Sequence, residues 1–128
     1  MNIKHKIQFG GNTDELVHKV LSGEKVATSS LYDYYLLGLK EMSKVDDFAL
    51  ILDSTGREVC VIRIEKIEIV KFRNITEQFA REEGDGNLSN WIKIHTDYYS
   101  GLLEKVGKYL TGDTKLVCEW FEVVNPQY

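Results

Sequence analysis

This chain of 128 residues has almost no proline, no long apolar run and no excess of positive charge. The single proline, Pro126, lies almost at the end, so no proline-rich linker divides the chain. No apolar run approaches the roughly 20 residues of a membrane-spanning helix. We therefore expect a single domain over residues 1–128, with no membrane as a partner.

Cysteine is also scarce, which bears on metals and cofactors. Cys60 and Cys118 sit in apolar, strand-like runs, where free buried thiols are more common than catalytic ones. No cysteine pair has the spacing of a metal clasp. The acidic stretch Glu82, Glu83 and Asp85 lacks the pattern of a calcium loop. We predict no metal ion and no cofactor.

The net charge of −4 argues against a protein that coats nucleic acid non-specifically. It leaves room for a small nucleic-acid pocket, because affinity for phosphate follows the local field. The opening residues, Met1 to Lys6, lack the apolar core of a secretion signal. We therefore expect a cytoplasmic location.

Two helices are predicted in the first third of the chain. Asn12 can cap a helix over Thr13–Ser22, with Glu15 completing a capping box, and Gly23 is the usual left-handed terminator. Ser30 can cap a second helix. The apolar side of that helix would consist of Leu31, Tyr34, Tyr35, Leu37, Leu39 and Met42.

Apolar and β-branched runs predict strands elsewhere. The expected extended segments are Lys25–Ser29, Phe48–Leu52, Glu58–Val70 and Lys115–Asn125. Asp53 to Gly56 is a turn sequence that joins two of them in a hairpin. The segment Glu58–Val70 is long for one straight strand, so we expect a bulge between Arg63 and Lys66.

Two further helices are expected before the last strand. Asn74 or Thr76 can cap a short one, a polar loop follows over residues 82–87, and a longer helix starts at Ser89 and runs to about Gly107. Its inward face would carry Trp91, His95, Tyr98 and Leu102. Because strands and helices do not alternate strictly, we predict an α+β fold with a small, curved, mostly antiparallel sheet flanked by helices.

Several ordered motifs in this chain resemble those of a known family. They are Gly23–Ser30, Leu50–Ile62, Thr76–Gly86 followed by Ser89, Trp91 and His95, and the closing Leu116–Phe121. Together, from about Leu16 to Val124, they resemble the ASCH domain family within the PUA-like superfamily. The resemblance implies a PUA-like pseudo-barrel, and RNA or a modified nucleoside as the partner.

Family members include an amidohydrolase that deacetylates N4-acetylcytidine, and others are described as ribonucleases. The amidohydrolase uses a lysine and a threonine in a Gly-x-Lys-x-x-Thr pattern, which falls on Gly23, Lys25 and Thr28. It also uses a glutamate three residues after an alanine, which places it at Glu83 after Ala80. The resemblance therefore implies Lys25, Thr28 and Glu83 as catalytic residues.

The remaining polar and aromatic residues of the motifs are candidates for substrate binding. They are Ser29, Asp85, Trp91, Lys93, His95 and Tyr98. The chain departs from longer members after Trp91, where they usually carry an arginine. Here Ile92 follows, with Lys93 next.

The sequence leaves the roles of these groups open. Lys25 can take the proton of Thr28 if burial lowers its pKa, or stabilise an oxyanion if a neighbouring carboxylate keeps it charged. In a ribonuclease, Glu83 or His95 can deprotonate the ribose hydroxyl. We expect a metal-independent hydrolase of RNA or a modified nucleoside. The alternative is a non-catalytic RNA-binding module.

Overall fold

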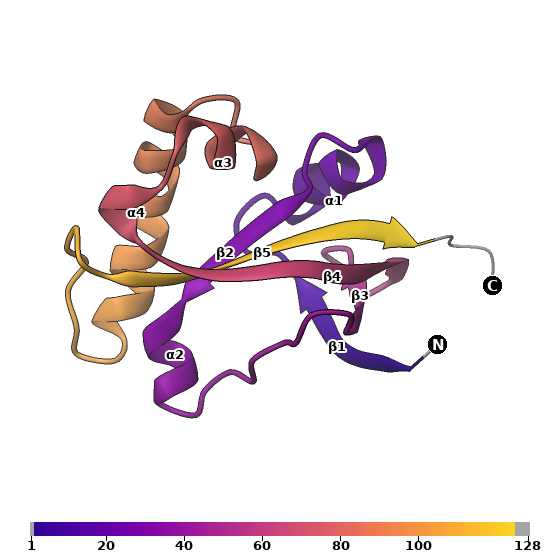
Figure 1. Ribbon diagram of the computed structural model, residues 1–128, viewed down its shortest axis with the longest axis horizontal. Coiled ribbons are helices and arrows are strands. Elements are labelled where there is room, and N and C mark those ends of the chain that lie inside the picture. The colour runs from indigo at the N-terminus through magenta and orange to yellow at the C-terminus, as the bar shows by residue number, and fades with distance from the viewer. Residues whose placement is uncertain (1, 125–128) are drawn as a thin grey trace.

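Residues 2–124 are described by the computed structural model, and within them the chain forms five strands, four α-helices and one 3₁₀ helix (Figure 1). In chain order these are β1 (Ile3–Gln8), α1 (Thr13–Ser22), β2 (Ala27–Leu31), α2 (Tyr32–Leu36), β3 (Phe48–Leu52), β4 (Glu58–Lys71), η1 (Phe72–Asn74), α3 (Glu77–Glu82), α4 (Leu88–Glu104) and β5 (Lys115–Val124). The predicted bounds of α1 and β3 are confirmed. The predicted end of the last strand, Asn125, lies outside the described residues. No helix within residues 2–124 has the length and apolarity that a membrane crossing requires.

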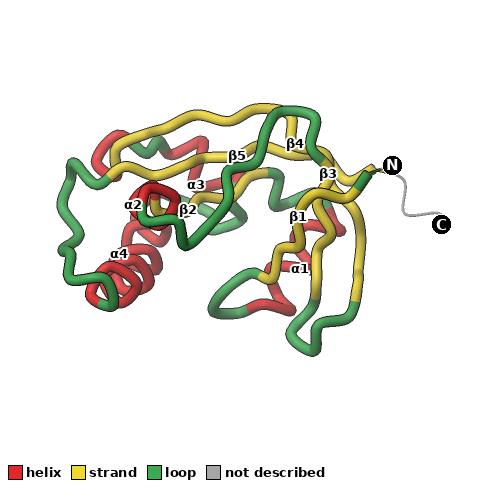
Figure 2. Tube along the Cα trace, turned by 90° about the horizontal axis from the view of Figure 1, so that it is seen from below, coloured by secondary structure: helices red, strands yellow, loops and turns green. Residues whose placement is uncertain are grey.

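The strands form one sheet in the order β1-β3-β4-β5-β2. β1 pairs with β3 in parallel, and the other three pairings are antiparallel. The α+β class and the mostly antiparallel sheet are thereby confirmed. β1 and β2 are the two edge strands and are not neighbours in this order. The curled sheet is therefore open on one side and forms a half-barrel. Figure 2 shows α1 beside β1 and β3, with α2, α3 and α4 toward the other end.

A bulge between Ile64 and Lys66 divides β4 into two halves, as predicted. Before the bulge, Cys60, Ile62 and Ile64 belong to an apolar cluster that also contains residues of α1. After the bulge, Val70 packs against a different apolar cluster, which contains residues of α4. Because one extra residue reverses the alternation of side chains, a single strand supplies both faces of the sheet with apolar residues.

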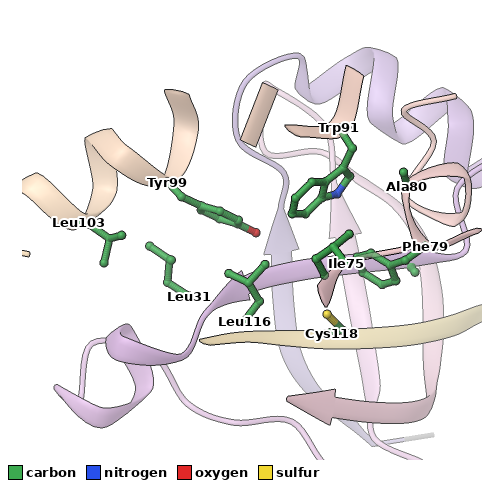
Figure 3. Close-up of a cluster of buried hydrophobic side chains, with 10 residues drawn as sticks. Leu31, Ile75, Phe79, Ala80, Trp91, Tyr99, Leu103, Leu116 and Cys118 are labelled. Carbon is green, nitrogen blue, oxygen red and sulfur yellow. The ribbon is translucent and has the colours of Figure 1, made fainter. Parts of the chain in front are cut away.

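Two apolar clusters hold the helices on the sheet. In the first, Trp91, Tyr99 and Leu103 of α4 point toward Leu31 of β2 and its neighbours on β5 (Figure 3). In the second, Val17 and Val20 of α1 pack on β3, β4 and Phe121. Full burial of one such large side chain contributes roughly 1.5–3 kcal/mol. The first cluster fixes α4 on β2 and β5, and the second fixes α1 on β3 and β4.

Some predictions about helix ends were wrong. The side chain of Asn12 donates to the carboxylate of Glu15 and makes no capping hydrogen bond to the backbone. Ser30 is a strand residue rather than a helix cap. The second helix ends at Leu36, because Gly38 takes a left-handed backbone (φ 75°), and the apolar residues expected on its buried side at Leu37, Leu39 and Met42 are exposed.

The caps of the later helices agree better with the sequence. The hydroxyl of Thr76 accepts from the Phe79 amide and caps α3, as predicted. The next helix starts slightly earlier than expected, because the side chain of Asn87 accepts from the Asn90 amide and caps α4 at Leu88.

Candidate functional site

A cavity of about 910 Å³ lies where β1, α1, β2 and α4 meet. Gly10 and Tyr98 both line this cavity, and the Tyr98 ring packs directly against Gly10. Any Cβ at position 10 would clash with that ring. Seven of the predicted site residues line the cavity: Lys25, Thr28, Ser29, Glu83, Asp85, His95 and Tyr98. Gly10 was not among the predicted site residues, because no motif in the sequence surrounds it.

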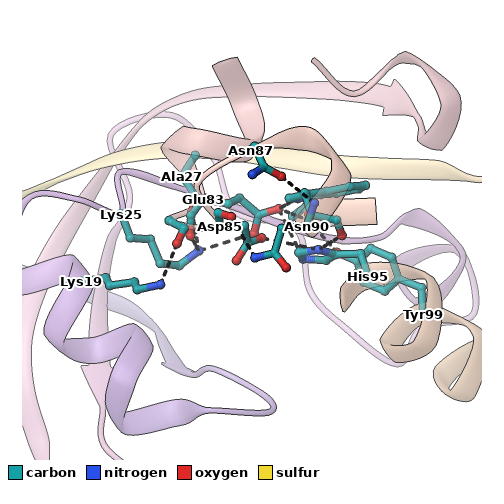
Figure 4. Close-up of polar contacts among 12 residues, drawn as sticks. Lys19, Lys25, Ala27, Glu83, Asp85, Asn87, Asn90, His95 and Tyr99 are labelled. Atoms are coloured by element: carbon teal, nitrogen blue, oxygen red, sulfur yellow. Dashed lines mark hydrogen bonds and ion pairs between the residues drawn. The ribbon is translucent and has the colours of Figure 1, made fainter. Parts of the chain in front are cut away.

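Lys25 and Glu83 meet at the wall of this cavity (Figure 4). Lys25 comes from the α1–β2 connection and Glu83 from the end of α3, and Lys25 Nζ lies 3.4 Å from Glu83 Oε1. The backbone sets this approach. Gly23 ends α1 in a left-handed conformation (φ 84°), and the Val26 amide then donates to the Glu82 carbonyl. The two segments are therefore joined directly beside the pair.

The ammonium of Lys25 is enclosed by acceptors. It donates to the carbonyl of Ala27 at 2.6 Å, to the carbonyl of Glu83 at 3.2 Å and to the Glu83 carboxylate. Three acceptors match the three donors of an ammonium group. Burial lowers the pKa of Lys25, and the charges of Glu83 and Asp85 partly offset this effect. Because the acceptors complete its coordination, we treat Lys25 as charged at neutral pH.

Glu83 is only 4% exposed and accepts several hydrogen bonds. Its Oε2 receives the Trp91 indole N–H at 2.6 Å and the Ser29 hydroxyl at 2.8 Å. Burial opposes ionisation of Glu83, but Lys25, His95 and these two donors outweigh it and lower its pKa. The carboxylate is therefore held ionised by its donors.

His95 and Asp85 extend this polar cluster. The His95 ring stacks on Trp91 with centroids 4.2 Å apart, and its Nδ1 lies 2.9 Å from the Trp91 carbonyl. Its Nε2 lies 3.5 Å from Glu83 Oε2. The side chain of Asp85 is 9% exposed, and its Oδ2, which lies 3.6 Å from His95 Nδ1, has no hydrogen-bond partner among residues 2–124. Burial and the nearby Glu83 raise the pKa of Asp85.

Glu83, Asp85 and His95 are close enough to share a metal ion, with one ligand atom of each within 4.8 Å of the others. The carboxylate of Glu83 is a poor ligand here, however, because Lys25, Ser29 and Trp91 already contact its oxygens. A cation would have to displace these donors and lie beside an ammonium group. The arrangement fits an ion-pair network better than a metal centre.

Thr28 and Ser29 point to opposite faces of β2, since side chains alternate along a strand. Ser29 Oγ lies 2.8 Å from Glu83 and 2.6 Å from the hydroxyl of Tyr99. Thr28 pairs across the strands with Glu119 and lines the cavity from the other face. The hydroxyl that contacts the ion pair is therefore that of Ser29, with Thr28 on the far side of the edge strand.

The aromatic residues of α4 are placed differently from the prediction. Trp91 is fully buried and does not line the cavity, so it supports Glu83 rather than offering a face to a ligand. Lys93 is exposed on α4 and also lies outside the cavity lining. The inward position belongs to Tyr99, while Tyr98 is 43% exposed at the rim. The spacing of four residues from Trp91 through His95 to Tyr99 could have identified Tyr99 in the sequence.

The family model of the ASCH domain matches residues 5–125. The chain belongs to the ASCH domain family. Two solved structures are similar over most of their length. The ASCH domain from Lactobacillus crispatus JV V101 is 27% identical with a TM-score of 0.88, and the match covers 93% of this chain and 78% of that one. Protein EF3133 from Enterococcus faecalis V583 is 30% identical with a TM-score of 0.89, over 97% of this chain and 78% of that one.

A more distant structure, hypothetical protein PH0355, is 16% identical with a TM-score of 0.62, over 97% of this chain and the whole of that one. At that identity the similarity concerns the fold alone. A comparison with curated proteins gave no match. The similarity to the Lactobacillus crispatus ASCH domain confirms the predicted PUA-like pseudo-barrel, with a curved sheet flanked by helices.

Proposed function

We propose that the cavity binds RNA or a modified nucleoside, and that this ASCH protein is a metal-independent hydrolase of that ligand. The proposal rests on one observation: the buried pair of Lys25 and Glu83 forms part of the wall of a cavity that Thr28 also lines. The cavity volume of about 910 Å³ falls in the range of small-molecule sites and leaves room for a nucleoside. Membership of the ASCH family supports the ligand class.

In the amidohydrolase form of the proposal, the Thr28 oxygen adds to the amide carbonyl carbon of the ligand. The Thr28 proton passes to the amide nitrogen, the C–N bond breaks and the amine leaves. Water then cleaves the acyl-threonine ester, which releases the acid and restores the hydroxyl. Because the Lys25 ammonium is paired with the Glu83 carboxylate, we assign Lys25 to stabilising the oxyanion rather than to removing the proton. In the ribonuclease form, the same ammonium would stabilise the phosphorane.

The test is incubation with N4-acetylcytidine and with labelled single-stranded RNA, each with and without a chelator. Product formed equally in both conditions, and reduced about 10²- to 10⁴-fold in Lys25→Ala, supports the proposal. If neither substrate is turned over at high enzyme concentration, the proposal that the protein is a hydrolase is wrong.

A non-catalytic RNA-binding module is the second candidate. It is favoured by the position of Thr28 on the opposite face of β2 from Ser29 and Glu83, and by the use of all three Lys25 donors within the protein. This candidate predicts RNA affinity that falls with salt concentration and no product.

A further inference from the structure

Glu119 is a buried carboxylate that the proposed chemistry does not use. It lies on β5, is only 7% exposed and lines the same cavity as the pair of Lys25 and Glu83. Its Oε2 has no hydrogen-bond partner among residues 2–124. An unpartnered buried polar atom destabilises a fold by about 1–3 kcal/mol, so such a group needs an explanation.

The position of Glu119 in the sheet directs it into the cavity. Its cross-strand partners are Thr28 on β2 and Ile67 on β4, so it shares the face of Thr28 rather than that of Ser29. Glu119 therefore stands on the other side of the edge strand from Glu83, and the cavity reaches both sides.

Four polar side chains stand near Glu119. Ser43 and Lys40 approach from the α2–β3 connection, and both also line the cavity. His5 is held by Asp47, with His5 Nε2 at 3.0 Å from the Asp47 carboxylate. Burial raises the pKa of Glu119; the nearby Ser43 hydroxyl and the charges of Lys40 and His5 act in the opposite direction, while Asp47 adds to the increase.

We propose that Glu119 is a ligand-binding residue, whose unpartnered oxygen accepts an N–H group of the nucleobase on the side of the cavity that Thr28 lines. This inference rests on the proposed function, because it assigns the base of the same ligand to a subsite. A carboxylate is a natural partner for base edges, which present ring or exocyclic N–H donors. Thr28, on the same face of the sheet as Glu119, then lies next to the bound base.

The experiment measures the affinities of the four ribonucleosides by calorimetry. For each one that binds, it also measures a counterpart whose base N–H groups are methylated, such as N4,N4-dimethylcytidine or N6,N6-dimethyladenosine. Wild type, Glu119→Leu and Glu119→Gln are compared, because leucine removes the acceptor and glutamine keeps one. Glu68→Gln is the matched control, since Glu68 is an exposed strand residue outside the cavity.

The wild type is expected to prefer the unmethylated base by about 10-fold or more, the effect of one hydrogen bond to a charged group. Glu119→Leu should bind both forms equally weakly, and Glu119→Gln should keep part of the preference. The thermal midpoint of Glu119→Leu should not fall, because the change removes an unsatisfied buried group.

Two results overturn the inference, and they are distinguishable. If the wild type binds a nucleoside but shows no preference, or if Glu119→Leu retains the preference, the subsite is wrong while the proposed function stands. If no nucleoside binds the wild type, the subsite and the nucleoside ligand class fail together.

Discussion

Lys25 and Glu83, 58 positions apart in the chain, form a buried ion pair with Nζ 3.4 Å from Oε1. The pair needs partners beyond itself, because removing two charges from water is costly. Trp91 and Ser29 supply hydrogen bonds to the carboxylate, and backbone carbonyls surround the ammonium. The consequences for stability and for activity can be tested separately.

Removal of one partner should be far more harmful than removal of both. Lys25→Met leaves the Glu83 carboxylate buried without its cation, and we expect a loss of about 3–5 kcal/mol in the free energy of unfolding. The double variant Lys25→Met/Glu83→Gln should recover most of this loss. Urea unfolding of the wild type, Lys25→Met, Glu83→Gln and the double variant measures the coupling. A double variant as unstable as the sum of the two single variants would show that the charges do not depend on each other.

The ion pair should also shape the stability of the protein in acid. The pKa of Glu83 is lower in the folded protein than in the unfolded chain, where it is about 4.3. Its contribution is therefore complete above about pH 4.3 and is lost as the pH falls through the lower, folded value. The free energy of unfolding of the wild type should fall on acidification more steeply than that of Lys25→Met/Glu83→Gln. Equal slopes in the two proteins would contradict the assignment.

Asp85 should behave in the opposite way. Burial and Glu83 raise its pKa, so its ionised form opposes folding and this penalty appears only as the pH rises above the unfolded value. Asp85→Asn should increase the free energy of unfolding at pH 7 and have little effect in strong acid. Chemical denaturation at the two pH values measures the difference. A variant that is destabilised at pH 7 would indicate that Asp85 has a favourable partner.

The adjacent hydroxyls of Thr28 and Ser29 should separate activity from stability. Ser29→Ala removes a hydrogen bond from both Glu83 and Tyr99, and we expect a loss of about 1–3 kcal/mol. Thr28→Ala should cost less stability but abolish amide hydrolysis, and Thr28→Ser should retain part of the activity. Thermal unfolding and a product assay on the same preparations make the comparison. Full activity in Thr28→Ala would exclude it as the nucleophile.

Local signals in the sequence identified much of the fold. Asp53 to Gly56 predicted the hairpin, and the length of the expected strand Glu58–Val70 predicted its bulge. β1 was missed, because its charged residues Lys4, His5 and Lys6 hide a strand whose pairing with β3 is determined by tertiary contacts. The second helix was predicted too long, because its leucines suggested a buried side that the fold leaves exposed.

The site was harder to predict, since periodicity does not say which side chains meet across the fold. The resemblance to the ASCH family pointed to Lys25 and Glu83, and the structure brings them together. Strand alternation alone could have warned that Thr28 and Ser29 face opposite ways. Nothing local in the sequence distinguishes the buried Glu119 from the exposed Glu122 on the same strand.

The most direct test of the account is kcat/KM for the wild type, Lys25→Met, Glu83→Gln and the double variant on N4-acetylcytidine and on RNA. Folding of each variant is first verified by circular dichroism. If the pair acts as one unit, each single variant should lose about 10²-fold or more, and the double variant should lose no more than the worse single variant. Undiminished turnover in either single variant, or no turnover by the wild type, would contradict the account.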